Sequence, residues 1–198
     1  MYFIAIDVET ANYNLHSICQ IGLAEYSMGT VTPLWESLLN PHEKFNRFNS
    51  ELHGITPELV KQAPSFPEIY SDLDAYLAGN IVISHTQFDQ KAINTACFHH
   101  NLPEIKCTWL DSTLIAKRAW PQFSQKGFGL ANLSRFLEFE FNHHDALEDA
   151  RACAQIVAMA IEQTGICAKE WLHRVKDPIS KFRNNNGSAQ PDPENIVG

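Results

Sequence analysis

Two acidic residues interrupt the first apolar run of the chain. Asp7 and Glu9 stand two residues apart in FIAIDVETAN, whose isoleucines and valine are typical of a buried strand. Side chains alternate between the faces of a strand, so both carboxylates point the same way. Burying two like charges together is costly unless a cation offsets them, and carboxylate oxygens suit Mg²⁺ or Mn²⁺. For this motif alone, loop capping or pairing with an arginine is the alternative.

A third acidic residue follows a short apolar segment near the middle of the chain. SHTQFDQKAI places Asp89 in the first turn of a helix predicted over 88–100, directly after a strand predicted over 81–84. Asp89 could favour the helix dipole, or it could direct its carboxylate toward the sheet edge beside Asp7. For the nearby His85 we favour a role in orienting the loop through a backbone hydrogen bond.

The segment HHDALEDARA, near the end of the chain, carries a histidine and three acids. Asp145 and Glu148 have the spacing of a capping box, which assigns them to the start of a helix predicted over 146–163. On a helix His144 and Asp149 would lie about 140° apart, so His144 must reach any shared site from the preceding loop. A histidine with an ordinary pKa near 6.5 can accept a proton from water at neutral pH.

Together these motifs form an ordered pattern: D-x-E on the first strand, F-D at a strand–helix junction, and H-x-x-x-x-D at a late helix start. The pattern, spread over residues 3–160, resembles the DEDDh group of 3′–5′ exonucleases, such as the polymerase III proofreading subunit and ribonuclease T. The resemblance implies an α/β, ribonuclease H-like fold, a mixed central sheet flanked by helices. It also implies two Mg²⁺ or Mn²⁺ ions held by Asp7, Glu9, Asp89 and Asp149, with His144 as general base.

Substrate contacts are likewise implied by the resemblance. Thr10 occupies the usual place near the terminal nucleotide, whereas Asn12 replaces the glycine that the family usually has. HGIT at 53–56 resembles the family loop that approaches the terminal base and sugar. The implied substrate-binding residues are Thr10, His53, Gly54, Ile55 and Phe88. For Ile55, ordinary loop packing is the alternative.

The implied activity is a metal-dependent 3′–5′ exonuclease that releases nucleoside 5′-monophosphates from single-stranded 3′ ends, with DNA favoured over RNA. Two alternatives stay open. One is a non-catalytic module that binds nucleic acid or a polymerase, and the other is a phosphoesterase acting on small molecules or nucleotides. A polymerase or repair protein, or a further domain after the tail, is the expected partner besides the nucleic-acid end.

The elements that must position these motifs follow from apolar periodicity. Strands are predicted over 2–8, 18–26, 31–39, 81–84 and 107–110, and helices over 66–78, 88–100, 112–119, 129–137 and 146–163. Ser65 and Ser112 are the expected caps of two of the helices. Strands first, then strands alternating with helices, predict a mixed sheet with helices packed on it.

Composition bounds the class of protein. The 198 residues carry a net charge of −8 and are 44% hydrophobic, so they can form a core but lack the basic field of a strong nucleic-acid binder. Five scattered cysteines indicate reduced thiols. No apolar stretch approaches the roughly 20 residues that cross a bilayer, and no secretory signal is evident, so a cytoplasmic location without membrane contact is predicted.

The chain is expected to divide into an exonuclease domain over 1–175 and a flexible tail or linker over 176–198, where prolines and an asparagine run replace large apolar residues. Within the domain, residues 106–135 hold five basic residues against one acid, with Trp120 and Phe123 interleaved. This segment could stack a single strand, or its aromatics could belong to the core.

Overall fold

One mixed five-stranded sheet organises the computed structural model, which describes residues 1–121, 127–139 and 141–183. Its strands are β1 (Tyr2–Thr10), β2 (Ile18–Ser27), β3 (Thr30–Leu38), β4 (Ile81–Ser84) and β5 (Thr108–Asp111), in the order β3-β2-β1-β4-β5. The first three strands pair antiparallel, whereas β4 runs parallel to both β1 and β5. This is the α/β, ribonuclease H-like arrangement that the motifs predict.

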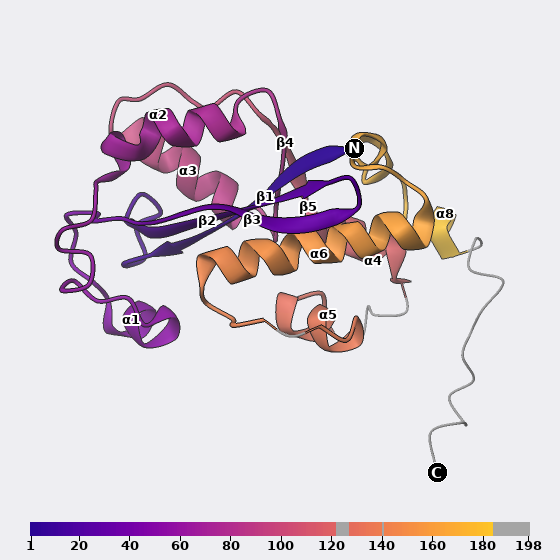
Figure 1. Ribbon diagram of the computed structural model, residues 1–198. Helices are drawn as coiled ribbons and strands as arrows, with labels where there is room; N and C mark the ends of the chain where they lie inside the picture. The colour runs from indigo at the N-terminus through magenta and orange to yellow at the C-terminus, as the bar shows by residue number, and fades with distance from the viewer. Residues whose placement is uncertain (122–126, 140, 184–198) are drawn as a thin grey trace, which may run out of the picture.

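Helices cover both faces of the sheet (Figure 1). The described helices are α1 (Arg47–His53), α2 (Phe66–Leu77), α3 (Phe88–His99), α4 (Ser112–Ala119), α5 (Leu130–Phe136), α6 (Ala146–Thr164), α7 (Ala168–Arg174) and α8 (Ser180–Arg183). Helices α2 and α3 lie on one face, and α4, α5 and α6 lie on the other. Each face has its own hydrophobic cluster, so β1 is buried on both sides.

The alternation of side chains along β1 decides where its acids go. Ile4, Ile6 and Val8 join the cluster beneath α2 and α3, whereas Phe3 and Ala5 join the cluster beneath α6. Asp7 and Glu9 continue the second series, because residues two apart on a strand share a face. Both acids therefore lie on the face of the sheet that α6 covers.

Helix starts agree with the sequence analysis in one case and correct it in another. Ser65 and Glu68 form the capping box of α2, as Ser65 was expected to do. Ser112, however, is the first residue of α4 and not its cap. The side chain of Asp111 accepts the Thr113 N–H at 2.8 Å instead, because the aspartate precedes the helix and its carboxylate reaches the free amide.

Three short helices have no counterpart among the predicted elements. Helix α1 lies in a proline-punctuated segment, and the Asn46 side chain caps it by accepting the Phe48 N–H. Helices α7 and α8 follow α6. Helices of four to seven residues show too little periodicity to be recognised in a sequence.

The fold continues beyond residue 175, where the tail was expected to begin. Phe182 of α8 is buried and stacks on Trp171, with ring centroids 5.7 Å apart. Arg118 donates to the Asp177 carbonyl oxygen from Nε at 3.0 Å and from Nη2 at 2.7 Å. Residues 176–183 thus pack on the domain, and residues 184–198 lie outside the described ones.

Two residues of the basic segment, Arg118 and Trp120, are buried. Trp120 is buried in the cluster beneath α6, which decides between its two proposed roles in favour of the core. Phe123 and Lys126 lie outside the described residues.

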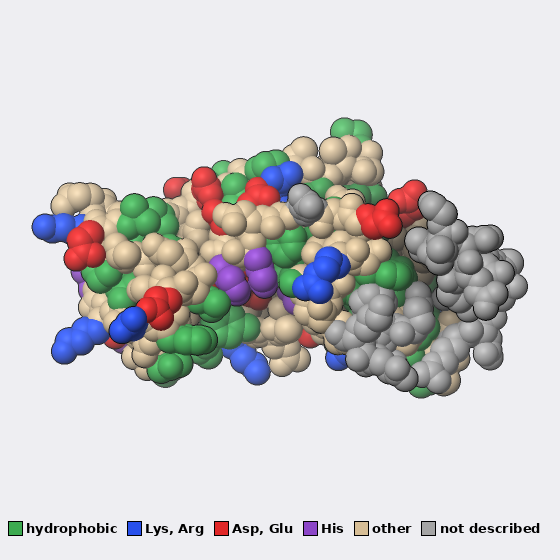
Figure 2. Space-filling view, turned by 90° about the horizontal axis from the view of Figure 1, so that it is seen from below, with side chains coloured by type: hydrophobic (Ala, Val, Ile, Leu, Met, Phe, Trp, Pro, Cys, Tyr) green, Lys and Arg blue, Asp and Glu red, His purple; other side chains and the backbone are tan. Residues whose placement is uncertain are grey.

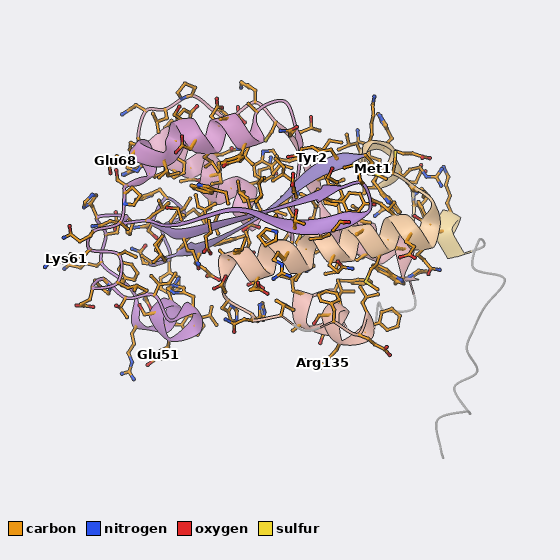
Figure 3. The ribbon with its side chains drawn as sticks, in the orientation of Figure 1. Met1, Tyr2, Glu51, Lys61, Glu68 and Arg135 are labelled. Atoms are coloured by element: carbon orange, nitrogen blue, oxygen red, sulfur yellow. The ribbon has the colours of Figure 1, made fainter. Side chains whose placement is uncertain are left out.

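None of the helices in the described part of the chain is long and apolar enough to cross a membrane. In Figure 3, Met1 and Tyr2 lie at the opposite end of the molecule from Glu51 and Lys61.

Candidate active site

The site begins with a close approach between a strand and a helix. Gly22 of β2 is paired with Asp7 of β1, and a side chain on Gly22 would collide with the backbone of Ala146 and Leu147. The first turn of α6 therefore rests directly on the sheet beside Asp7. Next to it, the Gln20 side-chain oxygen accepts the Ala146 N–H at 3.3 Å. Together, Gly22 and Gln20 set the position of the start of α6.

This packing brings three carboxylates together. Asp7, Glu9 and Asp149 each offer an oxygen within 4.8 Å of the others. Asp149 comes from the first turn of α6, whose cap is Asp145, as predicted. Glu148 does not close the expected capping box, because its carboxylate pairs with Arg151 one turn further along.

Asp89 joins the acidic group from the opposite layer. It stands in the first turn of α3 and is only 2% exposed. Its Oδ1 accepts the backbone N–H of Val8 at 3.0 Å. Val8 stands between Asp7 and Glu9 on β1, so this bond holds the Asp89 carboxylate against that part of the strand. The structure thus brings together the four acids singled out in the sequence.

Burial raises the pKa of every acid in the group and is the largest cause in each case. Neighbouring carboxylates add to it for Asp7, Glu9 and Asp89, whereas contacts with His143 and His144 oppose it for Asp149. The pKa of Glu9 rises to about 8 and that of Asp89 to about 7, and the pKa of Asp7 lies well above its ordinary value. Among the described residues no lysine or arginine pairs with these acids, so their charge lacks a permanent counter-ion.

Two adjacent histidines face the acids from the loop before α6. The ring atom Nδ1 of His144 lies 4.0 Å from Glu9 Oε1, and the backbone N–H of His144 donates to Asp149 Oδ2 at 2.9 Å. His143 Nδ1 lies 2.8 Å from Asp149 Oδ1, and its ring stacks on that of His144 at 3.9 Å. Burial lowers the pKa of His144, with His143 adding to the effect. The motif spacing pointed to His144 but not to the His143–Asp149 contact.

His85 has both ring nitrogens engaged in hydrogen bonds. Its Nε2 donates to the Phe128 carbonyl oxygen at 2.8 Å, so its Nδ1 must accept from the Ser112 hydroxyl, also at 2.8 Å. Burial lowers the pKa of His85 to about 4, which keeps it neutral. The expected loop-orienting role fits these two bonds.

A pocket of about 450 Å³ opens above the acids. Asp7, Glu9, Asp149, His143 and His144 line it, together with Thr10 and Phe88. Seen from below, histidine side chains gather near the middle of this face, beside hydrophobic side chains (Figure 2). Thr10 and Phe88 thus lie where a substrate contact was expected.

The other three implied contacts lie elsewhere. His53, Gly54 and Ile55 line a neighbouring groove of about 890 Å³, which shares His143, His144 and Leu52 with the pocket. Ile55 is 4% exposed and packs with Ala11, Cys19 and Val60. His53 Nδ1 accepts the Ile55 N–H, and its Nε2 donates to the Thr10 carbonyl oxygen at 3.2 Å. Both ring nitrogens of His53 thus brace the loop under Thr10.

Apolar side chains that the motifs did not reveal also line the pocket. Tyr13 and Phe48 are 76% and 62% exposed there, an uncommon state for large rings. The loop of Tyr13 is closed by Asn12, whose Oδ1 accepts the Asn14 N–H and whose Nδ2 donates to the Lys44 carbonyl oxygen, both at 2.8 Å. Asn12 thus forms a turn of its own where the family usually has glycine.

The donor set fits hard divalent cations. Oxygen-only carboxylate ligands suit Mg²⁺ or Mn²⁺, and the uncompensated charge with its raised pKa values is what a cation would relieve. Asp7, Glu9 and Asp149 would hold the ion or ions, with Asp89 supporting them from beneath.

Comparisons with known proteins agree with this site. A model of the Exonuclease family, RNase T type, matches residues 4–157. DNA polymerase III PolC-type of Streptococcus pneumoniae serotype 2 (strain D39 / NCTC 7466) is 24% identical over 164 residues, which are 81% of this chain but 11% of that protein. The chain therefore spans about a tenth of the length of this relative.

Two solved structures share the fold. Exonuclease X in complex with 5′ overhanging duplex DNA superposes with a TM-score of 0.72 at 20% identity, covering 87% of this chain and 99% of that one. E. coli Exonuclease I in complex with a dA16 oligonucleotide gives 0.71 at 13% identity, covering 88% and 43%. Fold and acidic site thus define a nuclease domain. The chain belongs to the Exonuclease family, and its motifs place it among the DEDDh-type members.

Proposed function

We propose that this protein is a metal-dependent 3′–5′ exonuclease acting on single-stranded ends. The observation that carries the proposal is the convergence of Asp7, Glu9 and Asp149 within 4.8 Å in a pocket that His144 also lines. DNA is the proposed substrate, since the relatives matched above include a DNA polymerase and two exonucleases described with DNA.

Each proposed role follows from the chemistry of a side chain. Two divalent ions, when bound, would lower the pKa of water and offset charge on the scissile phosphate. Asp7, Glu9 and Asp149 would bind them, with Asp89 as the fourth ligand that the motifs imply, its Oδ1 anchored by the Val8 N–H. His144, whose lowered pKa keeps it neutral at pH 7, would accept the proton of the attacking water. The products would be nucleoside 5′-monophosphates.

The pocket suits the end of a chain. Its exposed rings, Tyr13, Phe48 and Phe88, can stack on bases without reading their sequence. The match to a tenth of a PolC-type polymerase supports a further proposal, that the domain works on DNA ends beside a polymerase or repair partner.

A ladder assay tests the function. A 5′-labelled single-stranded DNA and its RNA counterpart are incubated with Mg²⁺, with Mn²⁺ or with EDTA, and the products are resolved on a sequencing gel. We expect a metal-dependent ladder that shortens from the 3′ end, faster with DNA. Absence of cleavage in either metal would contradict the proposal, and release of phosphate from a mononucleotide ester alone would replace it with a small-molecule phosphoesterase.

A further inference from the structure

Phe98 is a large apolar residue that is exposed on the surface and does not line the active-site pocket. It stands near the end of α3, remote in sequence from the motif of Asp89, and it is 84% exposed. Phe88, Lys91, Thr95 and Phe98 follow each other at spacings of three, four and three, so they form one stripe along the helix. Two exposed rings, Phe88 and Phe98, thus stand on one stripe with a cation between them.

The stripe borders a groove of about 540 Å³, here named the α3 groove. Its lining residues are Leu15, Gln87, Gln90, Lys91, Asn94, Thr95 and Phe98. Leu15 also lines the active-site pocket, and so does Phe88, which starts the stripe. The α3 groove therefore adjoins the pocket at Leu15. Helix α3 itself lies with α2 on one face of the sheet (Figure 1).

The α3 groove differs in charge from the groove lined by His53, which also adjoins the pocket. The groove lined by His53 also contains Glu36, Glu51 and Asp145, which would repel phosphates. The lining of the α3 groove has no acid, one lysine and three side-chain amides. Among the described residues Lys91 makes no ion pair, so its ammonium is available to a phosphate. Because the chain has a net charge of −8, a nucleic-acid strand leaving the pocket would meet less repulsion in the α3 groove than in the groove lined by His53.

We propose that the α3 groove binds the single strand upstream of the 3′ end, with Phe98 stacking on a base and Lys91 contacting a phosphate. The inference rests on the proposed function and extends it from the terminal nucleotide to the path of the strand. Phe98 lies ten helical steps after Phe88, or about 15 Å along the helix axis. At roughly 3.4 Å per stacked nucleotide, this length accommodates about four nucleotides.

Chain-length dependence of hydrolysis tests the groove. Phe98→Ser and Lys91→Glu are compared with wild type on a dinucleotide, which is too short to reach Phe98, and on a dodecanucleotide. We expect each variant to lower kcat/KM on the dodecanucleotide by roughly 5- to 100-fold, mainly through KM, and to leave the dinucleotide rate unchanged. Equal losses on both substrates, or no loss on either, would overturn the proposal.

Matched controls lie at the far end of the molecule. Met28, 93% exposed in the β2–β3 turn, is changed to Ser, and Lys169 on α7 is changed to Glu. Neither lines the pocket or its grooves, so both variants should match wild type on both substrates. Thermal unfolding of all four variants verifies that a loss is not one of folding.

Cross-linking separates failure of the groove from failure of the proposed function. Dodecanucleotides with a single 4-thiothymidine at successive positions are irradiated with the Asp7→Asn variant, and the adducts are mapped by mass spectrometry. Adducts from upstream positions on the peptide containing Phe98 are expected, whether or not wild type hydrolyses the strand. Hydrolysis by wild type with adducts only elsewhere would reject the groove alone and leave Phe98 as a protein-contact residue.

Discussion

Asp7 and Gly22 face each other across β1 and β2, and the missing side chain of Gly22 is what allows α6 to reach Asp7. The backbone of Ala146 and Leu147 occupies the space that a Cβ would need. A glycine on β2, which has no side chain, therefore decides how closely Asp149 approaches Asp7 and Glu9.

Gly22→Ala should displace the start of α6. Because the added methyl group would collide with the backbone of Ala146 and Leu147, we expect a loss of about 1–3 kcal/mol in the free energy of unfolding, with a drop in nuclease rate. Gly129→Ala is the control, since its Cβ would meet no atom within 4 Å. Urea unfolding and the ladder assay measure both. Wild-type activity in Gly22→Ala would show that the site tolerates a shifted α6.

Asp7→Asn and Asp149→Asn should each abolish hydrolysis while keeping the fold. Each substitution removes an oxygen ligand and also removes repulsion among buried acids. In EDTA these variants should therefore melt at or above the wild-type temperature, and added Mn²⁺ should raise their Tm less than that of wild type. Loss of folding would instead make the acids structural.

The stability of the metal-free protein should fall as pH rises. The pKa values of Glu9 and Asp89 are raised from ordinary values near 4 to about 8 and about 7, so the folded state binds more protons than the unfolded one over this range. The stability that these groups contribute is complete below about pH 4 and is lost as pH rises through about 7 to 8.

Tm measured in EDTA from acid to slightly alkaline pH tests this trend. Divalent cations bind the ionised acids, so Mg²⁺ or Mn²⁺ should restore stability most at the alkaline end. At 100 times the dissociation constant the gain would be about 2.7 kcal/mol. A flat Tm in EDTA that cations do not change would argue against an ion site at Asp7 and Glu9.

His144→Ala should slow hydrolysis by roughly 10²- to 10⁴-fold, the usual contribution of a general base, and leave the cation-induced rise in Tm intact. His143→Ala should cost less than about tenfold if its contact with Asp149 only orients that carboxylate. Single-turnover rates of the two variants, measured side by side, assign the base. The reverse order of effects would assign it to His143.

Phe182→Ala should destabilise the domain by about 3 kcal/mol, because the ring is buried against Trp171. The exposed Phe98→Ser is the control in the same unfolding experiment and should change little. If the unfolding midpoint of Phe182→Ala equals that of wild type, residues 176–183 contribute nothing to the stability of the domain and belong to the tail.

Much of the site could be predicted from local sequence. The D-x-E spacing places two carboxylates on one face, and strong apolar periodicity defines β1, α2, α3 and α6 to within about two residues. The Asp145 cap of α6 follows from the preference of a free amide for a nearby carboxylate. These features depend on neighbours in the chain, so a single sequence carries them.

Features that depend on distant residues were decided by the tertiary structure. Trp120 became a core residue rather than a stacking platform because α5 and α6 enclose it. His53 became a brace because the Thr10 carbonyl oxygen lies within its reach, 43 residues away in sequence. Similarly, only the packing of α8 on Trp171 shows that the domain extends past residue 175.

The sequence by itself therefore determined which residues could bind a cation and accept a proton, because residue type and strand or helix spacing set those capacities. The tertiary structure decided their relative positions: the approach of α6 over Gly22, the bond from Val8 to Asp89, and the two grooves of opposite character beside the pocket. The physical reason is that close packing joins segments with no local signal for one another, so distances across layers follow only from the whole fold.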